Sequence, residues 1–305
     1  MALRETLWLA MDTLRAHKLR SFLTLLGVIL AVTTLVAVMS VVEGLNLYVS
    51  DKIANLGANA FVVDRFGIIT NLEDFIKAKK RPPLSLDDYL ALRDGVTLSS
   101  KVGAIERTTT DIRAGNALFE DAFLLGATPN YAEIRDFEVI EGRFFTEADE
   151  MHHAPVAFIG NDLVQKFFPT ADPVGKTVRA GSNQYLIVGV AKARGTVFGQ
   201  SQDNFLMVPL STYRKSWHAP DDSVVIFVQA RGPEIMDAAQ DEARVIIRSL
   251  RHTPYEVPDG FGIIAPSSIT GLWNQITGNI FAIAVWLTSV FLVVGGIVIM
   301  NIMLA

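Results

Sequence analysis

Two long apolar stretches frame the chain. Phe22–Val42 has 21 residues and no charge, and a second uncharged stretch, Ile280–Ala305, closes the sequence. A helix rises about 1.5 Å per residue, so the first stretch would extend over roughly 30 Å, the thickness of a bilayer's hydrocarbon core. The residues between the two stretches have the mixture of polar and apolar side chains that is typical of a globular domain. The pattern predicts a water-soluble domain carried between two transmembrane helices, at residues 21–43 and 279–305.

The segment before the first span, residues 1–20, predicts an amphipathic helix that lies in the membrane interface. A soluble helix packed against a partner is the alternative. Four basic residues precede the span, namely Arg4, Arg15, Lys18 and Arg20. The positive-inside rule therefore places this end in the cytoplasm. A cleaved signal sequence is disfavoured, because the apolar stretch is longer than usual and no small-residue cleavage site follows it promptly.

Within the first span, Gly27, Ala31 and Thr34 are small residues that we place on one helix face, where a second helix could approach closely. Asn301 lies deep in the second span, where a lone amide favours a partner on a neighbouring helix. The chain stops at Ala305 without the interfacial anchors that usually end a span. We expect the sequence to be part of a longer protein.

Residues 44–278 are predicted to form the extracytoplasmic domain. Apolar or alternating segments predict strands at 59–66, 154–159, 177–180, 185–193, 205–209, 223–230 and 262–265. Lys101–Leu125 alternates around Gly115-Asn116, which predicts a β-hairpin. Ser85 can cap a helix that runs to Arg93, and Asn161 is placed as the cap of a helix that runs to Phe168. Pro233 suits the first turn of an amphipathic helix that ends near Leu250.

This order of elements predicts an α+β extracytoplasmic domain between two transmembrane α-helices. Strand–helix–strand units suggest helices packed on a sheet. The domain is expected to have two subdomains. The β-rich one, at about residues 112–210, would be inserted between two flanking α/β pieces.

Charge and composition narrow the function classes. The formal net charge is −5, and the region between the spans retains 23 Lys+Arg against 30 Asp+Glu. Such an acidic domain is an unlikely partner for nucleic acid. There is no cysteine, which excludes disulfides, thiolate metal sites and a cysteine nucleophile.

Candidate chemistry is sparse. Gly175-Lys176-Thr177 resembles the end of a phosphate-binding loop, but Thr170 stands where that loop needs glycine, so the tripeptide more simply opens a strand. His152-His153 fit no ligand spacing and are interpreted as a polar loop. The basic cluster Lys77–Arg81 is a solvated face or linker, or a contact for anionic lipid or an acidic partner. No G-x-S-x-G or H-E-x-x-H pattern occurs. We predict no catalytic, cofactor-binding or metal-binding residue in this chain.

Several stretches together resemble the MacB-like family of ABC transporter permeases, which have a periplasmic core domain. They are LRSFLTLLGV at 19–28, EG at 43–44, IANLGAN at 53–59, EGRFF at 141–145, VAFIG at 156–160, PVGKT at 173–177, VGV at 188–190 and VGGIVIMNIML at 294–304. Each piece alone is weak, but their order and spacing extend over nearly the whole chain. The residues that carry the resemblance are Arg20, Ser21, Gly27, Glu43, Gly44, Gly57, Asn59, Gly142, Arg143, Asp149, Gly160, Gly175, Lys176, Gly189, Gly295, Gly296 and Asn301. We interpret them as scaffold residues, and place Gly142 and Gly175 at turns that favour positive φ.

The resemblance implies a non-catalytic permease subunit of the cytoplasmic (inner) membrane, with four membrane helices and a periplasmic domain between the first two. ATP and Mg²⁺ would be bound by a separate ABC ATPase partner, and this chain would hold no cofactor. A second permease copy or paralogue completes a dimer, and a two-membrane cell would add a periplasmic adaptor and an outer-membrane channel. The family works by transmitting movement along its long helices for efflux or release of cargo outside the membrane.

The given sequence ends within the second span, where the family continues, and shows no nucleotide-binding domain before Met1, which some family members carry fused there. We therefore expect a permease half that depends on a separate ATPase subunit. The alternative interpretation is a bitopic sensor or ligand-binding module. A membrane-tethered hydrolase is a third, weaker one. Neither the cargo nor the choice between homodimer and heterodimer can be read from the residues.

Overall fold

The computed structural model describes residues 18–54, 59–197 and 199–304. They divide into two compact units, one built from residues up to Asp51 and from Ile269 onward, the other from Lys52–Ser268. The expected amphipathic helix at 1–20 falls almost entirely outside the described residues, as does Gly57. The mixed α/β fold between two terminal apolar helices confirms the predicted fold class.

The first unit holds two long helices, α2 (Lys18–Ala54) and α10 (Pro266–Leu304). Both contain a segment long and apolar enough to cross a membrane, Leu25–Asn46 in α2 and Pro266–Val294 in α10. With 37 and 39 residues, the helices measure about 55 and 58 Å. Each is therefore much longer than the roughly 30 Å of hydrocarbon that it would have to cross.

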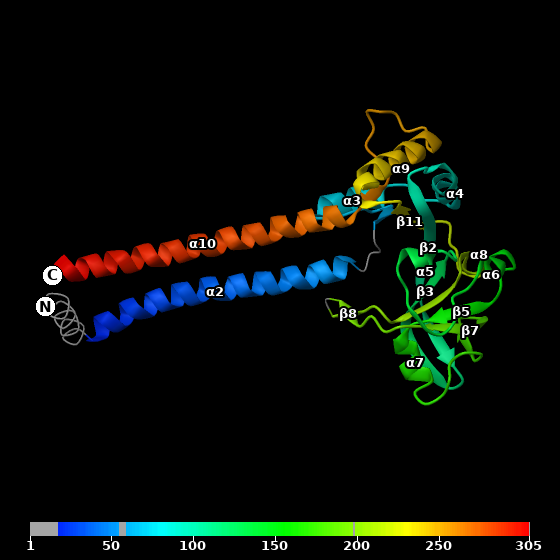
Figure 1. Ribbon diagram of the computed structural model, residues 1–305, viewed down its shortest axis with the longest axis horizontal. Coiled ribbons are helices and arrows are strands. Elements are labelled where there is room, and N and C mark those ends of the chain that lie inside the picture. The colour runs from blue at the N-terminus through cyan, green and yellow to red at the C-terminus, as the bar shows by residue number, and fades with distance from the viewer. Residues whose placement is uncertain (1–17, 55–58, 198, 305) are drawn as a thin grey trace. The chain divides into compact units, whose positions relative to one another are not determined.

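The second unit is built on one ten-stranded sheet with helices packed on it (Figure 1). Its strands are β1 (Ala60–Asp64), β2 (Ser99–Ala114), β3 (Ala117–Ala127), β4 (Val139–Gly142), β5 (Val156–Ile159), β6 (Thr177–Ala180), β7 (Asn183–Ala191), β10 (Phe205–Pro209), β11 (Val225–Ala230) and β12 (Gly262–Ile264). A separate two-stranded hairpin consists of β8 (Thr196–Val197) and β9 (Gln200–Ser201). The helices are α3 (Leu72–Lys79), α4 (Leu86–Gly95), α5 (Tyr131–Ile134), α6 (Glu147–Met151), α7 (Asn161–Phe167), α8 (Leu210–Ser216), the 3₁₀ turn η1 (Pro233–Ile235) and α9 (Met236–Leu250).

The sheet order is β12-β1-β11-β2-β3-β10-β5-β7-β4, and β6 pairs with both β2 and β7. Because β6 pairs with both β2 and β7, six strands form a closed barrel of paired neighbours: β2, β3, β10, β5, β7 and β6. The closure through β6 is narrow, since only Ile112 and Arg113 of β2 pair with it. Strand β2 belongs to both parts of the domain, because its first half pairs with β11 and its second half closes the barrel.

Three apolar clusters correspond to this layout. The first lies between α4, α9 and the strands β1, β2 and β11. The second fills the barrel, around fully buried residues such as Ile112, Leu124 and Ile187. The third, rich in aromatic residues, includes Phe158, Phe205 and Phe227 and is covered by α5.

Local signals in the sequence account for many boundaries. Gly115, with φ of 57°, makes the tight turn of the β2–β3 hairpin, as predicted. Ser85 accepts the Asp88 amide and the Asp88 carboxylate accepts the Ser85 amide, which completes a capping box. The prediction for Asn161 is wrong, because the N-cap is Gly160 and no side chain caps α7. Glycine occupies the cap position because the Asp203 backbone packs against Gly160.

We expect Ser85→Ala to lower the free energy of unfolding by about 1 kcal/mol, because it removes the side-chain acceptor of this capping box. Thermal unfolding followed by circular dichroism would measure the change. Ser182→Ala, in an exposed turn, is the control. An equal effect in the two variants would contradict the capping role.

Candidate functional site

Helices α2 and α10 pack along a narrow seam. The less exposed positions of α2 recur every three or four residues, at Gly27, Ala31, Leu35, Val38, Val42 and Asn46. Ala31 is fully buried. This spacing is typical of a helix that follows one partner along its length. Thr34 was placed on the same face, and that prediction is wrong: its side chain is exposed and donates to the Leu30 carbonyl at 2.8 Å.

On α10 the buried positions are Thr277, Ala284 and Thr288, which again share one face. The Thr288 hydroxyl donates to the Ala284 carbonyl at 2.8 Å, and the Thr277 hydroxyl to the Trp273 carbonyl at 3.0 Å. These hydroxyls are therefore satisfied within their own helix. Small residues at the seam let the two helices approach closely.

A polar clasp joins the helices near one end of the seam. The Trp273 indole Nε1 donates to Asn46 Oδ1 at 2.6 Å. A directional hydrogen bond fixes the axial register of two helices in a way that apolar packing alone does not.

The connections from these helices enter adjacent strands of the second unit. β1 begins at Ala60 after α2, and β12 ends at Ile264, two residues before α10 begins. β1 and β12 pair antiparallel, with Val62 opposite Ile264. Asn59 adopts the left-handed conformation, with φ of 57°, and its carbonyl accepts the Ala230 amide at 2.8 Å. Both helices are therefore covalently continuous with one edge of the sheet.

The glycines of the EGRFF and VGV stretches meet across β4 and β7. Gly142 has φ of 72°, and a Cβ there would lie 2.1 Å from the Val188 carbonyl oxygen. A Cβ on Gly189 would lie 2.2 Å from the Arg143 carbonyl oxygen. Glycine is needed at both positions because the two backbones touch.

Arg143 and Asp149 form a fork beside these glycines. Arg143 Nη1 donates to Asp149 Oδ2 at 2.6 Å, and Nη2 to Oδ1 at 3.3 Å. The Thr146 amide and hydroxyl donate hydrogen bonds to the same carboxylate, as part of the capping box of α6. The Arg143 hydrogen bond, followed by those of Thr146, lowers the pKa of Asp149 to about 2 against the opposing effect of burial.

Gly160 belongs to a second close contact. A Cβ on Gly160 would lie 2.1 Å from the Asp203 carbonyl oxygen. The Asp203 carboxylate is buried and accepts the amides of Arg194 and Gly195, each at 2.8 Å. The end of β5 is thereby packed against the base of the β8–β9 hairpin.

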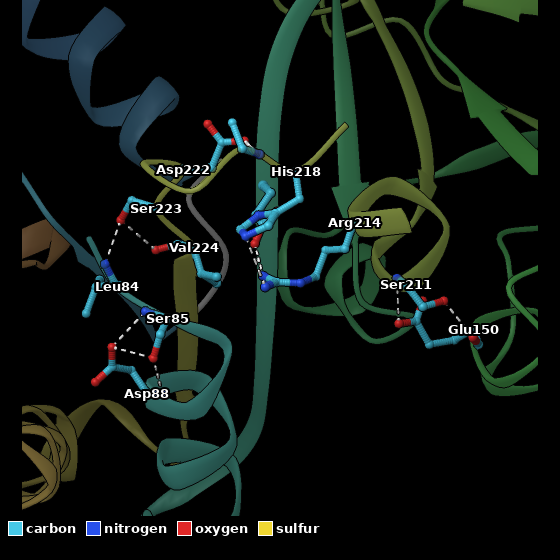
Figure 2. Close-up of polar contacts among 12 residues, drawn as sticks. Leu84, Ser85, Asp88, Glu150, Ser211, Arg214, His218, Asp222, Ser223 and Val224 are labelled. Carbon is cyan, nitrogen blue, oxygen red and sulfur yellow. Dashed lines mark hydrogen bonds and ion pairs between the residues drawn. The ribbon is translucent and has the colours of Figure 1, made fainter. Parts of the chain in front are cut away.

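A buried carboxylate holds the segment that returns from the barrel to β11. Glu106, on β2, is 1% exposed, bonds the Arg214 guanidinium and lies 3.0 Å from His218 Nδ1. Figure 2 shows Arg214 and His218 converging, and Ser223 beside Leu84. Ser223 Oγ accepts the Leu84 amide at 3.0 Å, so the far end of the segment is tied to the start of α4.

The structure therefore brings Gly142, Arg143, Asp149 and Gly189 together. Gly175 has φ of 82°, as its turn context predicts, and open space around it. Lys176 follows in that turn, and Thr177 begins β6, so the G-K-T tripeptide opens a strand as expected. Glu43 and Gly44 are exposed on α2, and Gly296 faces open space on α10. The side chains of Arg20, Ser21 and Asn301, and the surroundings of Gly295, lie outside the described residues.

Sequence reasoning missed Glu106 and Asp203. Glu106 directly follows an apolar segment, Val102–Ile105, and a carboxylate that continues an apolar strand is a signal that could have identified it. His152 ends α6, and His153 adopts φ of 50°. Within the described residues, no group of three or more His, Asp or Glu could hold a metal ion.

Comparison with known proteins gives a consistent assignment. The family described as MacB-like periplasmic core domain matches residues 21–246. The chain is 28% identical to the macrolide export ATP-binding/permease protein MacB of Bdellovibrio bacteriovorus over 98% of its length and 46% of that protein. It is 26% identical to the pyoverdine export ATP-binding/permease protein PvdT of Pseudomonas syringae pv. syringae over 94% of its length and 42% of that protein. The chain therefore spans less than half the length of these relatives.

Two solved structures share the fold. The periplasmic region of MacB from Actinobacillus actinomycetemcomitans aligns with a TM-score of 0.60 and 19% identity, over 73% of this chain and 96% of that one. The extracellular domain of the noncanonic ABC-type transporter YknZ from Gram-positive bacteria gives 0.53 and 20%, over 68% and 100%. The match to the family of MacB-like periplasmic core domains and the two apolar helices indicate a membrane protein with an extracytoplasmic domain.

We expect Asp149→Asn to lower the free energy of unfolding by about 1–2 kcal/mol at neutral pH, because a charge-assisted fork is lost. The folded pKa of about 2 lies below the ordinary 3.8, so the carboxylate's contribution is complete above about pH 4. It is lost as the pH falls towards 2. The stability difference between wild type and variant should therefore shrink over that window in thermal unfolding, whereas Asp221→Asn, in an exposed loop, should show no such trend.

Trp273→Phe keeps a ring in the seam and removes the Nε1–H donor, so we expect α2 and α10 to sample a wider range of separations. The chain has no cysteine, so spin labels can be introduced at exposed Thr34 and Ile283 without background. The distance distribution from double electron–electron resonance should broaden. Trp286→Phe, on the exposed side of α10, is the matched control, and identical distributions in all three proteins would contradict the clasp.

Proposed function

Because the chain belongs to the family of MacB-like periplasmic core domains, we propose that it works as the non-catalytic part of an ABC transporter permease subunit. In this proposal ATP and Mg²⁺ are bound by a separate ATPase on the cytoplasmic side. The long helices carry the resulting movement to the extracytoplasmic domain, which drives export or release of cargo. The protein would be a multi-pass protein of the cytoplasmic membrane with a cytoplasmic N-terminus.

The single observation that carries this proposal is the construction of the helix pair. α2 and α10 exceed a bilayer's hydrocarbon thickness by about 25 Å each and are packed along a regular seam. In the sequence they are followed and preceded by two strands that pair with each other, β1 after α2 and β12 before α10. A packed pair of this length suits the transfer of movement across and beyond a membrane.

The proposal includes a second permease copy or paralogue. The outward faces of both helices are apolar and exposed, with Val41 and Ile283 each at 60%. In a membrane such faces contact lipid or further helices. A periplasmic adaptor and an outer-membrane channel would be further partners in a two-membrane cell.

We expect proline at Val36, mid-span on α2, to uncouple ATP hydrolysis from transport. Proline removes a backbone donor and costs about 3 kcal/mol in a helix interior, so the helix should kink. Export by the full transporter should fall at least tenfold while ATP hydrolysis continues. Val36→Ala is the control for the lost side chain. Unchanged export in the proline variant would contradict the transmission of movement through α2.

A further inference from the structure

A cavity of about 350 Å³ lies on the face of the barrel that α5 and the β8–β9 hairpin flank. Its walls come from β2 and β3, from α5 and the residues that follow it, and from Gln200–Gln202 of the hairpin. The volume lies at the small end of the range of ligand pockets, about 300–1,000 Å³.

The cavity is cationic in an otherwise acidic domain. Arg107, Arg135 and Arg194 line it, and no carboxylate does. No hydrogen bond or ion pair joins Arg107 to a carboxylate in the described part of the chain. Like charges gathered at one concave surface raise the local concentration of anions.

Arg194 is fixed in place by its surroundings. Its Nη2 donates to the carbonyls of Arg135 and Asp136 at 2.6 and 2.7 Å, and its guanidinium lies 3.8 Å from the Phe137 ring centroid. Its direct partners are thus neutral carbonyls and a π face, and the Asp136 and Asp203 carboxylates act on its charge only from a distance. Burial, together with the neighbouring Arg135 guanidinium, lowers the pKa of Arg194.

Arg135 also lacks a charged partner. Its guanidinium lies 5.6 Å from the Phe227 ring centroid, and its buried Nε donates to no described acceptor. A buried N–H without a partner costs free energy, which a bound acceptor would recover after a small movement of the side chain.

The rest of the cavity wall combines neutral polar side chains, from Gln200–Gln202 and Asn204, with an apolar surface. Phe123, Leu125 and Phe205 contribute to it, and the Phe123 side chain remains 41% exposed. An inorganic anion would leave this surface in water, whereas a ligand with an aromatic or short aliphatic body would cover it.

We propose that this cavity binds a small amphipathic anion, with a carboxylate, sulfonate or phosphate head against Arg107 and Arg135 and an apolar body over Phe123 and Leu125. The inference does not depend on the transport function, because binding requires neither an ATPase nor a second subunit.

The test uses the whole chain in nanodiscs of zwitterionic lipid, with empty nanodiscs as the blank, in isothermal titration calorimetry. The probes are 2-naphthoate, the matched cation 2-naphthylmethylammonium, and inorganic phosphate. Naphthoate should bind saturably with one site per chain. The cation should not bind, and phosphate should bind at least tenfold more weakly than naphthoate.

Arg107→Gln and Arg135→Gln should each weaken naphthoate binding at least fivefold. Arg107 is exposed on its strand, so its variant keeps the test valid if Arg135→Gln disturbs the fold. Arg113→Gln, an exposed arginine of the same strand that does not line this cavity, should leave the affinity unchanged. The proposal is overturned by naphthoate heat equal to the blank, by equal binding of the cation, or by an equal loss of affinity in Arg113→Gln.

Discussion

The hydrogen-bond ladder of β2 is the interaction on which the extracytoplasmic domain depends. This one strand pairs with β11 over its first half, with β3 along most of its length and with β6 near its end. It therefore belongs both to the α/β layer that connects to the membrane helices and to the closed barrel. Where it passes from one part to the other it carries Glu106, whose buried carboxylate holds the returning chain through Arg214 and His218.

Two backbone contacts beside the barrel strands leave no space for a side chain. The Gly142–Gly189 and Gly160–Asp203 approaches bring backbones together at distances that exclude a Cβ. The polar groups at these points are paired locally, Asp149 with Arg143 and Asp203 with two amides. Several of the stretches that carry the resemblance to the MacB-like family are therefore places where two backbone segments come into contact.

Short-range features could be predicted and long-range ones could not. The apolar helices, the Gly115-Asn116 turn and the Ser85 cap follow from hydrophobic periodicity and local hydrogen bonding, and all are present. The barrel closure depends on two residue pairs between β2 and β6, distant in sequence, which no local pattern encodes. Asn161 has the right chemistry for a cap, but Gly160 takes that place because the Asp203 backbone lies against it. The arginine cavity draws on four separate segments, so only the fold assembles it.

The β1–β12 pair has a mechanical consequence that follows from chain connectivity. Val62 lies opposite Ile264, so the strand end that comes from α2 and the strand end that leads to α10 are at the same end of one short ladder. Pulling those ends apart would peel the ladder open one hydrogen-bonded pair at a time. Sliding them along the strands would load all its bonds at once. A domain attached in this way resists shear of its two attachment strands better than their separation.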